Sequence, residues 1–278
     1  MMLEARTAFT LLTVLPLRGP EHTDRRLAGR AMALAPFVGL ALGLLAGSAV
    51  FATRIVTAVP GQRAQTLLPA VVGVTVLALV TRGLHLDGLA DLGDGLGAWR
   101  ARGRDRALEI MRESTIGAFG AIIVLFVVLL QVGALSTTIS AHRGTLSILV
   151  AAMTSRLAAT LACTGAVPPA RPDGLGALVA GTVRTRDAAL SFLAVCAVAA
   201  LAGLLDFDGG GPGRALRAVL AVWVGTGVSF LLRRYLLTRF GGITGDILGG
   251  LIEITAAATL LVMAMTIPTP VLHTLGLH

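Results

Sequence analysis

The sequence has no lysine, two cysteines and few residues that carry charge or an aromatic ring. Of its 278 residues 4% are aromatic and 14% are charged, whereas 55% are hydrophobic, and the mean hydropathy is +0.84. This composition excludes an ordinary soluble globular protein. Cys163 and Cys196 lie far apart in apolar runs without Cys-x-x-Cys spacing, so we expect packing roles and neither a disulfide nor a cysteine metal site.

Long apolar runs dominate the chain instead. A membrane-spanning helix needs about 20 apolar residues, and seven segments come close to that length: 33–51, 64–84, 116–135, 145–163, 188–205, 215–232 and 247–267. The shorter run Ala8–Leu15 ends at Pro16 and is typical of an interfacial or re-entrant piece, not of a cleaved signal peptide. No repeat, linker or soluble domain is visible, so we predict one all-α, polytopic membrane domain over residues 1–278.

The basic residues indicate an orientation in the membrane. All 23 are arginines, and the net charge is +8. Such a charge could indicate nucleic acid as a partner, but the arginines are scattered through short loops between the apolar runs. A positive-inside bias in a lipid bilayer explains them better, so we expect no nucleic-acid partner. Most of them fall in the inner segments if the N-terminus is inside, which predicts a cytoplasmic N-terminus and an outer C-terminus.

Residues 85–95 read HLDGLADLGDG, an acidic run that follows an apolar segment. In a helix, the i, i+4, i+7 spacing of Asp87, Asp91 and Asp94 places them on one face. Three carboxylates beside a membrane repel one another and call for a cation. Oxygen ligands without a cysteine or histidine cluster suit Mg²⁺, which also bridges to phosphates. The alternative is a solvated loop that ends a helix, and His85 is either a base or an interfacial side chain.

A second polar group follows across a short loop. Glu109 and Glu113 stand at i, i+4, while Arg112 and Ser114 stand at the mouth of the next span. A solvated helix with internal salt bridges would show the same alternation of charge. The nearness of the acidic run favours a functional role.

Two more groups lie within or beside apolar runs. Arg156 follows Ser155 inside a span, where an isolated charge costs roughly 2.5 kcal/mol or more. It therefore needs an anion, either an internal carboxylate or a substrate phosphate. A glycine-rich segment with Thr244 and Asp246 precedes the last span and offers backbone N–H groups to an anion. Glu253 lies about two turns further along, so we expect a partner such as Arg156.

At one membrane face the sequence places carboxylates for Mg²⁺, arginines for phosphate and a glycine-rich helix start. These are the groups that phosphoryl transfer on a diphosphate requires. At these motifs the sequence closely resembles the cobalamin synthase family, the adenosylcobinamide-GDP ribazoletransferases. The resemblance covers nearly the whole chain. The matching segments are His85–Asp91 with Asp94-Gly95, Leu108–Ser114 with Ile116-Gly117 and Phe119-Gly120, Ser155-Arg156, Gly242 with Thr244–Asp246 and Gly249, and more weakly Pro36-Val38-Gly39.

The resemblance implies a multi-pass enzyme of a bacterial cytoplasmic (inner) membrane with its active site facing the cytoplasm. Such enzymes join α-ribazole, or its 5′-phosphate, to adenosylcobinamide-GDP with Mg²⁺ and release GMP. Our hypothesis makes the ribazole 5′-hydroxyl the nucleophile. It assigns catalysis to His85, Asp87, Asp91 and Asp94, metal binding to Asp87, Asp91, Asp94 and Glu113, and substrate contacts to Glu109, Arg112, Ser114, Ser155, Arg156, Thr244, Asp246 and Glu253. A homo-oligomer or a complex with other corrinoid-assembly enzymes is left open.

Two alternatives remain at this point. The spacing of Asp91, Asp94 and Gly95 is loosely similar to the CDP-alcohol phosphotransferases, which would use the same acids on a lipid. A transporter would use Arg156 and Glu253 as a coupling pair, although the spans show no inverted repeat.

Overall fold

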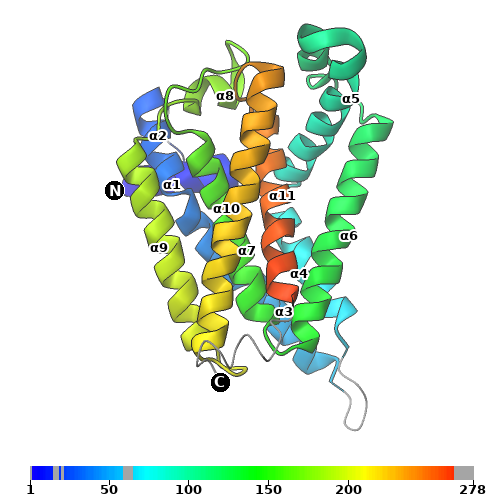
Figure 1. Cartoon of the computed structure of the whole chain (residues 1–278), viewed down its shortest axis with the longest axis vertical. Helices are drawn as coiled ribbons and strands as arrows, with labels where there is room; N and C mark the ends of the chain where they lie inside the picture. The colour runs from blue at the N-terminus through cyan, green and yellow to red at the C-terminus, as the bar shows by residue number, and fades with distance from the viewer. Residues whose placement is uncertain (1, 15–18, 20–21, 59–64, 266–278) are drawn as a thin grey trace.

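The computed structural model describes residues 2–14, 19, 22–58 and 65–265. Apart from two isolated β-bridges, the regular structure in these ranges is helical. The helices are α1 (Met2–Leu12), α2 (Arg25–Ala33), α3 (Ala35–Val56), α4 (Leu67–Val80), α5 (Leu84–Ile110), α6 (Ala118–Ser140), α7 (Gly144–Ala162), α8 (Gly174–Val179), α9 (Thr185–Leu204), α10 (Pro212–Phe240) and α11 (Gly245–Ala264). Figure 1 shows the long helices side by side in one bundle.

The helices long and apolar enough to cross a membrane confirm the all-α polytopic prediction. Among the described residues six such helices stand alone: α3, α6, α7, α9, α10 and α11. Each overlaps a predicted span, although residues 266–267 of the last one lie outside the described residues. The pair α4 and α5, bent by 88° at its break, passes the same test together and brings the number to seven if it is one broken span.

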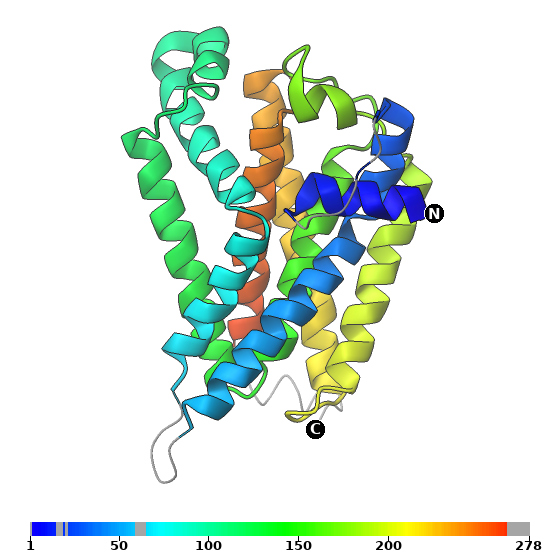
Figure 2. The same ribbon diagram turned by 180° about the vertical axis from the view of Figure 1, so that it is seen from behind.

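The break between α4 and α5 is where the structure differs from the predicted span 64–84, whose residue 64 lies outside the described ranges. With 14 residues, α4 is about 21 Å long, too short for a hydrocarbon core of about 30 Å. Arg82 and Gly83 take the left-handed conformation, with φ of 51° and 69°, and end the helix. In a single broken span, the acidic α5 completes the crossing that α4 begins (Figure 2).

The N-terminal helix does not span the bundle. Figure 2 shows α1 lying across the long helices. Its Ala8 and Leu12 pack against Ala31 and Ala35, which belong to α2 and α3. This agrees with the predicted short non-spanning N-terminal segment, although Leu15 and its neighbour Pro16 lie outside the described residues.

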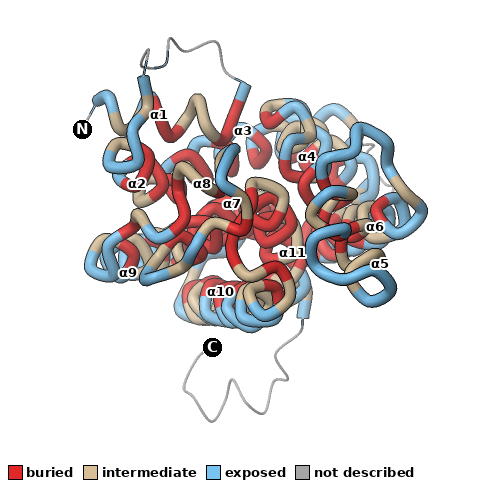
Figure 3. The backbone as a smooth tube through the Cα atoms, turned by 90° about the horizontal axis from the view of Figure 1, so that it is seen from above, coloured by how far each residue is buried: buried red, intermediate tan, exposed pale blue. Residues whose placement is uncertain are grey.

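Helices α7 and α11 form the centre of the bundle, where the buried residues concentrate (Figure 3). The outer helices α6 and α9 instead expose large apolar side chains, such as Phe126 and Leu193. Close packing on α7 depends on glycine: a Cβ on Gly39 of α3 would lie 2.4 Å from the carbonyl oxygen of Ala152. Small residues at such a crossing let two backbones meet within lipid.

The two glycines Gly39 and Gly133 give a matched test of this packing. Gly39→Ala forces α3 away from α7, and overpacking of this kind costs about 1–3 kcal/mol. Gly133 lies on the exposed face of α6, and a Cβ there would meet no atom within 4 Å, so Gly133→Ala should be neutral or slightly stabilising. Thermal unfolding in detergent measures both variants. Equal melting temperatures would contradict the close crossing.

Candidate active site

The acidic run lies on a helix that touches α11 backbone to backbone. A Cβ on Gly88 would lie 3.0 Å from the Asp246 Cα, and one on Gly249 would lie 3.1 Å from the carbonyl oxygen of His85. Asp87, in the first turn of α5, is thereby brought to the first turn of α11. The acidic run is helical, as its spacing predicts, and the alternative of a solvated loop is wrong.

A cavity of about 240 Å³ lies at this crossing. It opens between the ends of α1 and α2, the first turns of α5 and α11, and residues 171–176 that lead into α8. Its polar lining comes from His85, Asp87, Arg171, Asp173, Thr244 and Asp246. A neighbouring hollow of about 690 Å³ follows the α4–α5 break and also includes Asp87. The Asp87 side chain therefore borders both spaces.

The loop before α8 is fastened to the start of α11. The Ala170 amide donates to the carbonyl oxygen of Ile243 over 3.0 Å, and the Ile243 amide donates to that of Pro168 over 3.0 Å. Beside this bridge, Arg171 donates to an Asp246 carboxylate oxygen at 3.2 Å. The bridge and the ion pair hold one arginine and one carboxylate at the cavity wall.

Thr244 has a structural role at the same place. Its hydroxyl accepts a hydrogen bond from the Ile247 amide at 3.1 Å and forms the N-cap of α11. The cap fixes the direction of the first turn and hence of Asp246. The sequence prediction of a helix start at the glycine-rich segment is confirmed.

The aspartates at positions 91 and 94 have different surroundings. Asp94 accepts hydrogen bonds from the amides of Gly117 at 2.7 Å and Gly120 at 2.9 Å, so it caps α6. Within the described ranges the Asp91 carboxylate accepts no hydrogen bond, and it interacts electrostatically with Asp87 and the other acids nearby. Asp94, a predicted metal ligand, thus caps a helix, whereas Asp91 has no hydrogen-bond donor among the described residues.

Arg156 is buried in α7 and contacts α5. It is 2% exposed; it donates to Ser155 Oγ at 3.0 Å, and its Nη2 lies 3.4 Å from His85 Nδ1. Glu253 instead accepts a hydrogen bond from Gln131 at 2.8 Å. Arg156 and Glu253 interact only electrostatically, and in the described part of the chain they form no direct ion pair. The predicted partnership is therefore electrostatic and not a contact: Ser155 and His85 contact Arg156, and Gln131 contacts Glu253.

The acids in the last turn of α5 and just after it lie at the surface. Arg106 pairs with Glu109 at 3.0 Å and with Glu113 at 3.1 Å. Arg112 pairs with Asp173 at 2.6 Å and so connects the α5–α6 loop to the loop before α8. These contacts are the salt-bridged, solvated arrangement given above as an alternative. Ser114, between them and α6, is exposed.

The predicted ligand set does not converge. Among the described residues no three side chains of His, Cys, Asp or Glu are placed to hold one metal ion. Asp94 turns to the amides of α6, and Glu113 turns to Arg106. The acids that remain are Asp87 and Asp246, which line the cavity, and Asp91, which interacts electrostatically with both.

Arg171 and Asp173 are site residues that sequence reasoning did not select. They belong to the short stretch Arg171-Pro172-Asp173-Gly174, which is typical of an ordinary turn. Their importance comes from pairing with Asp246 and Arg112, which lie far away in the chain. No local spacing pattern could have indicated those pairs.

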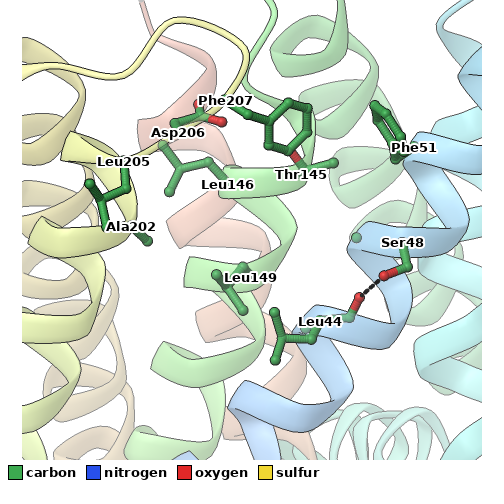
Figure 4. Close-up of a pocket in the computed structure, with 12 residues that line it drawn as sticks. Leu44, Ser48, Phe51, Thr145, Leu146, Leu149, Ala202, Leu205, Asp206 and Phe207 are labelled. Carbon is green, nitrogen blue, oxygen red and sulfur yellow. Dashed lines mark hydrogen bonds between the residues drawn. The ribbon is translucent and has the colours of Figure 1, made fainter.

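The opposite end of the bundle has a hollow of another kind. It measures about 440 Å³ and is lined mainly by apolar residues of α3, α7 and α9 (Figure 4). Its carboxylate, Asp206, is bound by Arg214. The nearby Asp208 pairs with Arg54 at 2.7 Å, and although burial opposes ionisation, this pair lowers the pKa of Asp208. Among the described residues, a cavity-lining carboxylate without an ion-pair partner, Asp87, therefore marks the first cavity and not this one.

The fold and the site define a class: a multi-pass helical membrane protein with an acidic, arginine-lined cavity at one end of the bundle. Residues 4–264 match the family model described as cobalamin-5-phosphate synthase. The chain belongs to this family, as the sequence motifs predict.

Similar proteins cover almost the whole chain. An adenosylcobinamide-GDP ribazoletransferase of Nocardioides sp. is 37% identical over 261 residues, which is 93% of this chain and 97% of the relative. The protein of that name from Stutzerimonas stutzeri is 35% identical over 270 residues, or 96% and 99% of the two chains. One from Corynebacterium efficiens is 33% identical, covering 94% and 90%. No solved structure matches.

The contrast between the two aspartates can be measured. Asp94→Asn replaces an acceptor of two amide hydrogen bonds and should lower stability by about 1 kcal/mol, the usual cost of a lost helix cap. Asp91→Asn removes a charge from among like charges and should raise the melting temperature in detergent. The same direction of shift for both variants would contradict the assigned roles.

Proposed function

We propose that this chain joins adenosylcobinamide-GDP to α-ribazole, or to its 5′-phosphate, and releases GMP in the last stage of nucleotide-loop assembly of cobalamin. The observation that carries the proposal is the family match over residues 4–264, which includes the motifs that build the cavity. Relatives that carry the name of this activity align over nearly their full length. A lipid-directed CDP-alcohol phosphotransferase and a transporter are not favoured by these comparisons.

The reaction exchanges one phosphorus–oxygen bond for another. A ribose hydroxyl of ribazole attacks the phosphorus on the cobinamide side of the diphosphate, a new P–O bond forms, and the P–O bond to GMP breaks. An acceptor that already carries a 5′-phosphate has no free 5′-hydroxyl. The attacking oxygen shared by both acceptors is therefore another ribose hydroxyl, which corrects the 5′-hydroxyl of the sequence-based hypothesis.

The carboxylates around the cavity fit Mg²⁺. This ion takes oxygen ligands, keeps several waters and is commonly held by one or two carboxylates together with substrate phosphates. Asp87 and Asp246 line the cavity, and Asp91 lies close enough to both for electrostatic interaction. We assign Asp87 and Asp246 as the two carboxylates that would hold the ion together with substrate phosphates. When bound, Mg²⁺ would neutralise charge on the diphosphate.

The remaining groups bind and orient the substrates. Arg171 lies at the cavity wall, and Arg112 pairs with the cavity-lining Asp173, so we assign both to phosphate oxygens. The first turn of α11 presents amides at the same wall. Because Asp91 accepts no hydrogen bond from the described protein, its oxygens are free to take the proton of the attacking hydroxyl.

Release of GMP tests the proposal. Membranes containing the protein, incubated with adenosylcobinamide-GDP, α-ribazole and Mg²⁺, should release GMP that chromatography detects. A chelator should stop the release, and added Mg²⁺ should restore it. Asp91→Asn should abolish turnover while the protein still inserts. Absence of GMP would overturn the proposal, and release of CMP from a CDP-linked lipid donor would point to the phosphotransferase alternative.

We further propose a bacterial inner-membrane location with the cavity facing the cytoplasm. Loop arginines gather at the cavity end, as in Arg102 and Arg184, and a positive-inside bias puts that end in the cytoplasm. In a background of Cys163→Ala and Cys196→Ser, Ala101→Cys should be shielded from an impermeant thiol reagent in intact cells.

Gln65→Cys should react in the same cells, because residue 65 is exposed at the end of the bundle where α4 begins. The C-terminal His278, a natural labelling position for the outer face, lies outside the described residues. Reversed labelling of the two variants would overturn the orientation, and permeabilised cells, in which both should react, serve as the control.

A further inference from the structure

The contact between Arg156 and His85 connects a buried charge to the wall of the cavity. Both side chains are almost fully buried, with 2% and 3% of their surface exposed. The arginine Nη2 lies 3.4 Å from Nδ1 of the imidazole. His85 also lines the cavity, and its Nε2 has no hydrogen-bond partner in the described structure.

The chemistry of the guanidinium fixes the protonation of the ring. All five N–H groups of arginine donate, and none of its nitrogens accepts a hydrogen bond. The Nδ1 atom of His85 must therefore be the acceptor in this contact and carry no proton. A neutral imidazole has one N–H, so the proton lies on Nε2. The Nε2 atom, which has no partner, is therefore a hydrogen-bond donor.

We infer that His85 acts as a neutral hydrogen-bond donor to a phosphoryl oxygen of the substrate, and that Arg156 is the positioning residue that holds it in this tautomer. The inference rests on the proposed function and deepens it. It removes His85 from the candidates for the general base, since Nδ1 is occupied by Arg156 and Nε2 already carries a proton.

The surroundings of the pair support this assignment. In the described structure no carboxylate forms an ion pair with Arg156, so its charge is not cancelled at close range. Nδ1 of His85 faces that guanidinium at 3.4 Å, so a proton on Nδ1 would meet a group that only donates. The unpartnered Nε2 of His85 is a buried polar group that an acceptor in the cavity would satisfy. The diphosphate of the substrate supplies such acceptors.

Two amide substitutions separate a donor from a base. In His85→Gln the amide nitrogen can take the place of Nε2 and donate, while the amide oxygen can accept from Arg156. In His85→Asn the shorter side chain does not reach the Nε2 position. Loss of one donor to a developing negative charge lowers kcat by about 100- to 1,000-fold.

We therefore expect the Asn variant to lose about 100-fold or more in kcat, while the Gln variant stays within about tenfold of the wild type. Equal, large losses in both would overturn the donor role, because neither amide can act as a base. Melting temperatures of the purified variants show whether either loss reflects unfolding.

A spectroscopic readout tests the tautomer without turnover. Nitrogen NMR of the full chain labelled with ¹⁵N-histidine distinguishes the two neutral tautomers from the cation, and His85→Gln identifies the signal of residue 85. We expect the Nε2-protonated form in the wild type. An Nδ1-protonated or doubly protonated ring would overturn the inference. Since this measurement needs no substrate, failure of GMP release would refute the proposed function and leave the tautomer result standing.

Arg156→Met tests the positioning role of the arginine. It should mix the tautomers in the NMR spectrum and lower kcat more than KM changes. If the methionine variant does not fold, Arg156→Lys replaces it: lysine also only donates, so the tautomer should be retained. An unchanged tautomer and kcat in Arg156→Met, or loss of the tautomer in a folded Arg156→Lys variant, would contradict the role given to Arg156.

Discussion

The backbone contact between α5 and α11 determines where the acids of the site lie. Gly88 and Gly249 meet with no side chain between them, so the first turns of two helices that are far apart in the sequence share one cavity wall. Any larger residue at position 88 would separate Asp87 from Asp246. The mutual repulsion of these acids opposes the contact, and the apolar packing of the bundle around α7 and α11 has to outweigh it.

The acids that have partners and the acid that has none are found at different places in the bundle. Three acids that are buried or half-buried elsewhere in the described structure have partners: Asp94 has two amides, Glu253 has Gln131 and Asp206 has Arg214. Asp91 has no hydrogen-bond partner among the described residues and interacts electrostatically with Asp246 and Asp87, which line the cavity. A fold that satisfies its acids in three other places leaves this one open, and such exceptions are characteristic of functional sites.

The sequence predicted the spans, the helical acidic run and the helix start at Thr244, because each depends on spacing within one segment. It did not predict that Asp94 would turn to the amides of α6, since that depends on how two helices cross. The bend at residues 81–83 was also missed, because an apolar run that continues through Thr81 hides a left-handed turn. Arg171 was missed for a third reason: its partner Asp246 is brought near only by the bundle.

The buried arginine shows most clearly where local reasoning ends. A charge in an apolar span predicts that a partner exists, and Glu253 was the obvious anion by composition. The structure gives Arg156 a histidine and gives Glu253 a glutamine instead. A direct ion pair would have cancelled the two charges. The neutral imidazole of His85 lies between Arg156 and the cavity. The positive charge of Arg156 therefore polarises the Nε2–H group of His85, which can donate to a diphosphate in the cavity.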